Sequence, residues 1–579
     1  MQRRVEIVFL ILTCTFSLSC GNRSESGSSS LDAIAEEFVY TALSFSPIAA
    51  TGAGYHERSE EQLDDWSAAG VAKQRAFYAG MQKRLAETGK ESLLLDARAD
   101  WEILSDQVSL NLLEFDTIQN YKHNPTFYVE LVGNALFSPY MLEYSPKNVR
   151  MEQIVARLEK VPGFLKVAKG NLVDAPEVWN RVAREENDGT MGLIDKTLRA
   201  EMPADLQPRF TKAADAALAA MREFNEWLEK DLSQRTSDWR LGKEKYGKKY
   251  SFAMGTGQDP EALLRDAETT LETTRRKMLE IATPMHAKHF PGAKGGDLNK
   301  IVRETLDMIG ERHATPGTYM ADARRDLDEV KLFVQEKQLL TLPTRANLQV
   351  IETPEFMRGI YGVGGFNAAP PLQPQLGAFY WITPIPKDWP AERIDSKLRE
   401  YNFFGLKLLT IHEAIPGHWV QLEYANDVAP ISRRLLRGIF GSGPYVEGWA
   451  VYATEATLDA GYLDNSPELR LMFLKQQLRM IANTILDIRM QSMNMQDEDA
   501  MRLMLEQTFQ EKEEATAKLQ RAKLSSTQLP TYYAGYREWV KLRDKEKAKG
   551  SFQQIDFHER ALKFGAVPMR VLGQLMEQR

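Results

Sequence analysis

The chain has 579 residues, of which 43% are hydrophobic, and its formal net charge is −7 at pH 7. This mild negative charge and the lack of a clustered basic stretch argue against a nucleic-acid partner. Both cysteines, Cys14 and Cys20, fall in the N-terminal segment, so the rest of the chain has no disulfide and no thiol chemistry. Any metal held by the body of the protein must therefore be bound by nitrogen and oxygen atoms.

The N-terminal segment has the pattern of an export signal. A short basic region precedes an apolar core at residues 7–18, which is too short to span a bilayer. Residues 17–21 then resemble a bacterial lipobox, although the leucine lies one place closer to Cys20 than usual. We therefore predict that residues 1–20 form a signal peptide. Residues 21–30 are polar and serine-rich, as a flexible tether would be.

A lipid attached to Cys20 would hold the exported protein on a bacterial membrane, facing the periplasm or the cell surface. The alternative is ordinary cleavage near this point, which would leave a soluble exported protein. No later segment is apolar for long enough to cross a membrane. The sequence does not indicate an oligomeric state.

Residues 31–340 have mainly helical periodicity and are predicted to form a helical N-terminal region. Asp259 and Pro260 mark a clear helix start, because an aspartate caps the helix and proline suits its first position. Apolar residues recur at helical spacing after this point, and Pro284 is expected to end the helix. No repeat of fixed length is present, which argues against a solenoid.

The pattern changes near residue 341. Residues 348–352 alternate like a strand, and residues 378–383 form a second predicted strand inside a segment rich in glycine and proline. Helical periodicity resumes near Ala391 and continues almost to the end of the chain. The predicted fold is therefore mainly α, with a small sheet, and residues 341–579 form its second region.

Residues 412–418 carry the most informative motif of the chain. Two imidazoles and a carboxylate, His412, His418 and Glu413, lie within seven positions, and Glu447 follows in a second helical segment. Together they provide two nitrogen ligands, one carboxylate ligand, one further carboxylate and an open coordination position, as a hydrolytic zinc site requires. The alternative is a polar helix end with no metal.

The spacing of the two histidines tests this interpretation. In the usual helical zinc motif the histidines are four residues apart and share one face. A step of six residues on an ideal helix would turn His418 about 240° away from His412. Pro416 and Gly417 lie between them, and proline followed by glycine can break or bulge a helix. We expect such a break to bring His418 round to the same ion.

Residues 410–418, taken with residues 447–450, resemble the DUF885 family of bacterial proteins, many of which are lipoproteins. The resemblance continues over further positions that match the family pattern: Gln528, Tyr532, Gly535, Leu542, Arg543, Phe557, His558, Gly565 and Pro568. The family is in turn similar to the gluzincin-type zinc metallopeptidases, whose folds are largely helical. Residues 487–491 depart from the pattern, because the family histidine expected there is absent.

The resemblance implies a large helical body with the small sheet beside a zinc-peptidase-like cleft, and a catalytic role for residues 341–579. One zinc ion would be ligated by His412, His418 and Glu447. In the peptidases that this chain resembles, an edge strand pairs with the extended substrate backbone. Residues 378–383 are the candidate for that strand, and the alternative is a core hairpin that binds no ligand.

Three residues are candidates for catalysis. Glu413 directly follows the first ligand, so its side chain would flank the metal and serve as a general base. Zinc peptidases commonly supply a phenol or an imidazole to the oxyanion. Tyr532 and His558 match family positions and are the candidates, with Tyr532 favoured over Tyr533. A structural role is the alternative for His558, and an ion pair is the alternative to substrate binding for Arg543.

The predicted function is zinc-dependent hydrolysis of a peptide bond or another amide bond. One alternative is a metal-binding protein without turnover, in which the six-residue step fails to seat His418. Another is a helical surface lipoprotein that binds a ligand or partner and in which the histidines have no functional role. His286 and His289 also have helical spacing, but no acidic residue lies near them in the sequence, and they are predicted to be a solvated helix end.

Overall fold

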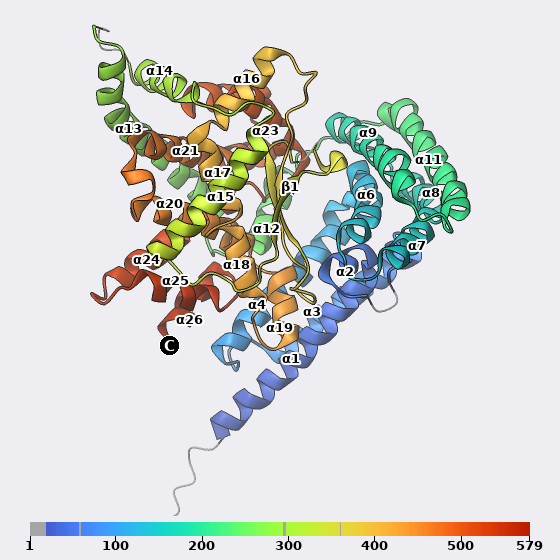
Figure 1. Ribbon diagram of the computed structural model, residues 1–579. Coiled ribbons are helices and arrows are strands. Elements are labelled where there is room, and N and C mark those ends of the chain that lie inside the picture. Colours follow the sequence, from blue (N-terminus) through green and yellow to red (C-terminus); the bar gives the residue numbers. More distant parts are fainter. Residues whose placement is uncertain (1–18, 57–58, 293–296, 359–360, 579) are drawn as a thin grey trace, which may run out of the picture.

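The computed structural model describes residues 19–56, 59–292, 297–358 and 361–578. The protein is mainly α-helical and contains one small sheet (Figure 1). The predicted signal peptide lies outside the described residues up to position 18. Residues 21–30 lie within helix α1 (Ser19–Phe45) rather than in an irregular tether. Extending an existing helix needs no new nucleus, so even a serine-rich segment can continue it.

The first group of helices packs near the N-terminal end of the chain. Its buried side chains include Phe38, Leu104 and Leu436, the last of which comes from a helix far along the sequence. The group contains α1, α2 (Pro47–Ala53), α3 (Ala68–Thr88), α4 (Leu95–Leu113) and α19 (Ile431–Ile439).

The second group forms the bundle at the right of Figure 1. It has a core of its own, which includes Ile154, Phe210 and Met221. The group contains α5 (Asn120–His123), α6 (Pro125–Met141), α7 (Lys147–Leu158), α8 (Val161–Asn171), α9 (Glu177–Gly192), α10 (Arg199–Glu201) and α11 (Gln207–Lys230).

The largest core joins helices from both sides of residue 340. Leu271 and Val330 belong to it together with Ile481 and Trp449, so the change of sequence pattern near residue 341 is not a boundary between separate cores. Its helices before that point are α12 (Gly242–Met254), α13 (Pro260–His289), α14 (Leu298–Gly310) and α15 (Tyr319–Glu336). Those after it are α16 (Ala391–Glu400), α17 (Phe403–Glu413), α18 (His418–Ala425), α20 (Gly443–Asp459), α21 (Pro467–Ser492), α22 (Asp497–Arg502), α23 (Lys512–Leu524), α24 (Thr531–Lys547), α25 (Gln554–Leu562) and α26 (Met569–Glu577).

Helix α13 confirms one predicted helix boundary and corrects another. Asp259 caps its start, where its Oδ1 accepts a hydrogen bond from the backbone N–H of Ala262 at 2.6 Å. The prediction that Pro284 ends the helix was wrong, because α13 continues to His289. Proline removes a single backbone donor. Ala282 and His286 are buried on either side of it, and this packing holds the helix together across the proline.

The sheet has three strands in the order β1-β3-β2. β1 (Leu348–Glu352) and β3 (Ala378–Ile382) lie where strands were predicted, and β2 (Gly364–Asn367) is additional. β3 pairs with β1 in parallel and with β2 in antiparallel orientation. The prediction that residues 378–383 form a free edge strand was therefore wrong. Both edges of β3 are already paired and its five residues are buried, whereas β2 is an outer strand.

Candidate metal centre

A break between α17 and α18 brings the two histidines together. α17 ends at Glu413 and α18 begins at His418, so His412 lies in the last turn of one helix and His418 at the start of the next. The backbone N–H of Gly417 donates to the carbonyl oxygen of Ile411 at 3.0 Å. The indole N–H of Trp449 donates to the carbonyl oxygen of Pro416 at 2.9 Å. The predicted break at the proline and glycine is confirmed, and these bonds fix its course.

Glycine is required at position 417 because the chain passes so close to itself there. A Cβ at this position would lie 1.9 Å from the carbonyl oxygen of His412 and 2.4 Å from that of Ile411. Both obstacles are backbone atoms, which cannot rotate away as the end of a side chain can. The lack of a side chain at Gly417 therefore sets the angle at which α18 leaves α17.

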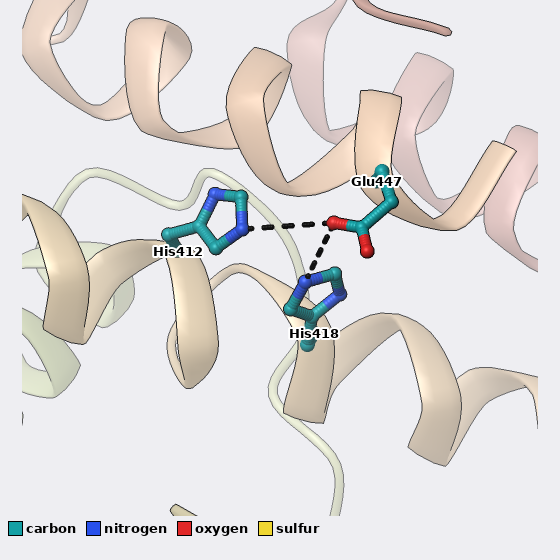
Figure 2. A group of neighbouring side chains, drawn as sticks. All are labelled: His412, His418 and Glu447. Atoms are coloured by element: carbon teal, nitrogen blue, oxygen red, sulfur yellow. Dashed lines mark ion pairs between the residues drawn. The ribbon is translucent and has the colours of Figure 1, made fainter. Parts of the chain in front are cut away.

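Glu447 approaches the histidines from α20, as Figure 2 shows. Its Oε2 lies 3.3 Å from Nε2 of His418 and 3.8 Å from Nε2 of His412. The two imidazole rings have their centroids 4.8 Å apart and are nearly perpendicular. The three candidate ligand atoms all lie within 4.8 Å of one another. Among the described residues, this is the only group of its kind.

A close contact between helices α20 and α24 positions Glu447 and the tyrosine opposite it. A Cβ on Gly448 would lie 2.3 Å from the backbone of Gly535, and one on Gly535 would lie 1.8 Å from the carbonyl oxygen of Pro444. The two helices therefore touch through their backbones. This contact places Glu447, next to Gly448, near Tyr532, one turn before Gly535.

His418 is buried, His412 and Glu447 are partly buried, and the surroundings of the triad shift the pKa values of all three. Burial lowers the pKa of His412 to about 3, so its imidazole is neutral, as a metal ligand must be. Burial favours the neutral form of Glu447, but its contact with His418 outweighs this and lowers the pKa of the carboxyl group. The Oε2 atom of Glu447 is buried and has no hydrogen-bond partner among the described residues. The same contact raises the pKa of His418, so a metal ion bound here would take the place of the proton on that imidazole.

Two of the three distances between the candidate ligand atoms are close to those expected around one zinc ion. Bonds of ~2.1 Å in a tetrahedral arrangement place ligand atoms roughly 3.4 Å apart. The two contacts to Glu447, at 3.3 and 3.8 Å, are close to this value. The donor set of two imidazoles and one carboxylate also matches the sites in which zinc keeps a coordination position open.

The triad lies on the wall of a cavity of about 1100 Å³, and Glu413 and Tyr532 line the same cavity. Burial raises the pKa of the Glu413 carboxyl group to about 7, and the charge of Glu447 adds to the effect. Burial also raises the pKa of Tyr532 to about 12, so the phenol keeps its proton. The cavity thus presents a proton acceptor and a proton donor near the candidate ligands.

Tyr532 and Tyr533 point in different directions. The Tyr532 ring stacks on His412 with centroids 6.3 Å apart, and its hydroxyl accepts a hydrogen bond from Gln528 at 3.3 Å. The Tyr533 hydroxyl donates to Asp266 at 2.6 Å, in helix α13. Only Tyr532 of the two lines the cavity, so the geometry favours Tyr532.

His558 does not join the site. It is buried, its Nδ1 lies 2.8 Å from the carbonyl oxygen of Leu339, and its Nε2 lies 2.9 Å from the hydroxyl of Tyr452. It does not line the cavity. Both of its nitrogens are committed to structural hydrogen bonds, which is the structural alternative weighed above. Arg543 is also outside the cavity lining, where it pairs with Asp544 at 2.8 Å.

Several cavity residues had no role assigned from the sequence, notably Arg521, Lys518 and Arg479. Arg521 hydrogen bonds to the Gln528 side chain at 3.0 Å and to the Tyr532 hydroxyl at 3.4 Å. The match of Gln528 and Tyr532 to the family pattern was the signal that pointed to this neighbourhood. The departing segment, residues 487–491, does not line the cavity.

Two further carboxyl groups that line the cavity, Glu130 in α6 and Glu186 in α9, have unusual surroundings. Glu186 is only 6% exposed, and neither of its carboxylate oxygens has a hydrogen-bond partner among the described residues. Burial and the neighbouring Glu130 raise the pKa of Glu186 from its ordinary value of 4.5 to about 9.

We expect Glu186→Gln to stabilise the protein at alkaline pH. Because the pKa of Glu186 is higher in the folded state, the folded protein retains a proton that the unfolded chain loses above pH 4.5. Stability is therefore lost as the pH rises from 4.5 towards 9. The substitution should increase the free energy of unfolding by about 2 kcal/mol at pH 8 and very little at pH 5. Thermal unfolding at both pH values tests this, and an equal effect at the two would contradict it.

The fold and the site define a mainly helical protein with a partly buried cluster of two histidines and one glutamate on the wall of a large cavity. The chain belongs to the DUF885 family, described as bacterial proteins of unknown function, whose family model matches residues 47–576. No curated protein matches the chain.

Two solved structures share the fold. One is described as a candidate lipoprotein of unknown function from Shewanella oneidensis; it is 29% identical, the match covers 97% of this chain and 100% of the other, and the TM-score is 0.77. The other is described as a candidate lipoprotein from Colwellia psychrerythraea; it is 17% identical, with 95% and 99% covered and a TM-score of 0.77. The second likeness concerns the fold alone.

Proposed function

We propose that the protein is a zinc-dependent hydrolase that cleaves a peptide bond or another amide bond. The observation that carries this proposal is the convergence of His412, His418 and Glu447 on the wall of a cavity that Glu413 also lines. The likeness to gluzincin-type metallopeptidases, noted from the sequence motifs, agrees with the same chemistry.

Zinc is the preferred metal because two imidazoles and a carboxylate match its usual donor set, and no thiolate is present in the body of the chain. When bound, the ion supplies Lewis acidity, which lowers the pKa of water and polarises a carbonyl group. His412, His418 and Glu447 would hold it.

Side chains that line the cavity would transfer the protons and stabilise the oxygen of the attacked carbonyl group. Glu413 accepts the proton of the attacking water and delivers it to the leaving amine. Its raised pKa of about 7 is close to the value that suits a group acting first as a general base and then as a general acid. Tyr532 remains protonated and donates a hydrogen bond to the oxygen of the attacked carbonyl group.

An extended substrate would lie along β2 rather than along β3. Gly364, Gly365 and Phe366 of β2 line the cavity, and β2 occupies an outer position in the sheet. Its unpaired edge offers backbone groups to a peptide by strand addition.

The proposed location is the outside of a bacterial membrane, held by a lipid on Cys20. The lipobox-like sequence before Gly21 supports this, as do the two structural relatives described as candidate lipoproteins. Among the described residues, no helix is both long and apolar enough to cross a bilayer.

Elemental analysis of the purified protein tests the proposal. We expect one equivalent of zinc in the natural sequence and none in His412→Ala, because two remaining ligands do not hold the ion tightly. A peptide pool incubated with each protein and followed by mass spectrometry should be cleaved only by the first. Stoichiometric metal without any cleavage would favour a metal-binding protein. The absence of metal would favour a ligand-binding surface lipoprotein.

A further inference from the structure

One face of helix α23 carries charged side chains into the cavity beside the metal centre. Glu514, Lys518 and Arg521 all line the cavity. Their spacing of four and three residues places them along one side of the helix. Glu447 lies near enough to act on the pKa values of both Lys518 and Arg521.

The carboxylate on this face already has its partners. Glu514 pairs with the guanidinium of Arg479 and accepts a hydrogen bond from the Tyr401 hydroxyl at 3.2 Å. Another buried cation nearby is also satisfied, since Lys397 donates to the carbonyl oxygen of Gly362 at 2.9 Å. Glu514 thus has Arg479 as its direct partner, and it acts on Lys518 only at longer range.

Among the described residues, Lys518 and Arg521 differ from these groups because no carboxylate lies within ion-pair distance of either. Lys518 is only 4% exposed, yet within the described part of the chain its ammonium group makes no hydrogen bond or ion pair. Among the described residues, Arg521 donates to two neutral groups, the Gln528 amide oxygen and the Tyr532 hydroxyl. Burial, together with the charges of Arg479 and Arg521, lowers the pKa of Lys518 well below its ordinary value.

An ammonium group buried without a direct partner is unfavourable, and these surroundings therefore favour the neutral amine of Lys518. An anionic group bound in the cavity would offset this cost, because charge-assisted hydrogen bonds to ammonium and guanidinium groups are among the strongest. A carboxylate is the anion that a peptide substrate carries. It occurs at the C-terminus or on an acidic side chain.

We propose that Lys518 and Arg521 form a subsite that binds a carboxylate of the substrate beside the metal centre. The proposal rests on the proposed function and specifies its substrate class: peptides that present a carboxylate a short distance from the bond that is cleaved. The C-terminal carboxylate would make the protein a carboxyl-end exopeptidase, whereas an acidic side chain would make it selective for acidic sequences.

Three pools of N-acetylated tripeptides serve as probes. The first has a free C-terminal carboxylate, the second is amidated, and both lack Asp and Glu. The third is amidated but carries Glu at its last position. Apparent affinity is measured from the rise in unfolding temperature of zinc-loaded Glu413→Gln protein at several concentrations of each pool. Hydrolysis of the same pools is followed by mass spectrometry with Glu413 intact.

We expect the free-acid pool to bind at least about tenfold more tightly than the neutral amide pool. Lys518→Met, which keeps the length of the side chain, should reduce that ratio towards one, and the charge-retaining Lys518→Arg should preserve most of it. Selection of the Glu pool instead would assign the carboxylate to a side chain. Equal affinity for the three pools, or no binding by any, would overturn the subsite.

The outcomes separate this inference from the proposed function. Hydrolysis without preference for a carboxylate would overturn the subsite and leave the hydrolase standing. Selective binding without hydrolysis would support the subsite and overturn the proposed hydrolase. Lys518→Met replaces an amine that is buried without a direct partner by an apolar group, so its unfolding temperature should not fall. If that variant nevertheless fails to fold, Lys518→Gln replaces it in the same comparison.

Discussion

Glu413→Gln is expected to reduce hydrolysis by about a thousandfold or more while the protein retains its zinc. Glutamine has the same size and still fits the buried position at the end of α17, but it cannot accept a proton. The three ligands are untouched, because Glu413 is not one of the converging atoms. Cleavage rates on a peptide pool and elemental analysis of the same preparation provide the measurement.

Glu455→Gln is the matched control. Glu455 lies on α20, the helix that supplies Glu447, and burial raises its pKa as well. It accepts a hydrogen bond from the Tyr536 hydroxyl at 3.0 Å and does not line the cavity. Cleavage by this variant should stay within a few-fold of the natural protein. A Glu413→Gln protein with full activity would rule out Glu413 as the base.

Local chemistry explains why part of the structure was predictable. The cap at Asp259 and the alternation in residues 348–352 depend on interactions between near neighbours, and both predictions were confirmed. The break between His412 and His418 could also be predicted from the sequence, because proline and glycine act on the backbone at the positions where they occur. Their spacing alone did not show that the break would bring the imidazoles to 4.8 Å from each other.

Long-range packing explains what was missed. The order of the strands depends on which segments pair across the sheet, and β2 was not recognised, so the central position of β3 could not be foreseen. The same applies to His558, whose partners Leu339 and Tyr452 are 219 and 106 residues away. The prediction for Pro284 was wrong because packing on both sides of the proline outweighs its local tendency to end a helix.

The charged residues of α23 are a further feature that was missed from the sequence. In the sequence, Lys518 and Arg521 belong to a highly charged helical segment, residues 511–523, and such segments usually form a solvated helix face. Only the fold shows that this face turns towards a cavity and that the ammonium group of Lys518 lacks a partner. Burial is a property of the tertiary structure, so no local pattern reveals it.

Gly417→Ala is expected to weaken zinc binding by about a hundredfold and to abolish hydrolysis with it. The added methyl group would meet the carbonyl oxygen of His412 at 1.9 Å, so α18 would have to move away from the end of α17. His418 is the first residue of α18 and would move with it, out of reach of the ion that His412 and Glu447 would hold. Zinc affinity measured by competition with a chelator tests this expectation.

Gly170→Ala is the matched control, because it introduces the same methyl group at a helical glycine with nothing within 4 Å. That variant should bind zinc normally and be slightly more stable, since alanine favours the helix by about 1 kcal/mol. If Gly417→Ala also binds zinc normally, then the backbone contact at the break does not position His418. A loss of zinc in Gly417→Ala with an intact fold would show that the turn between the two helices, and not the ligands alone, makes the metal site.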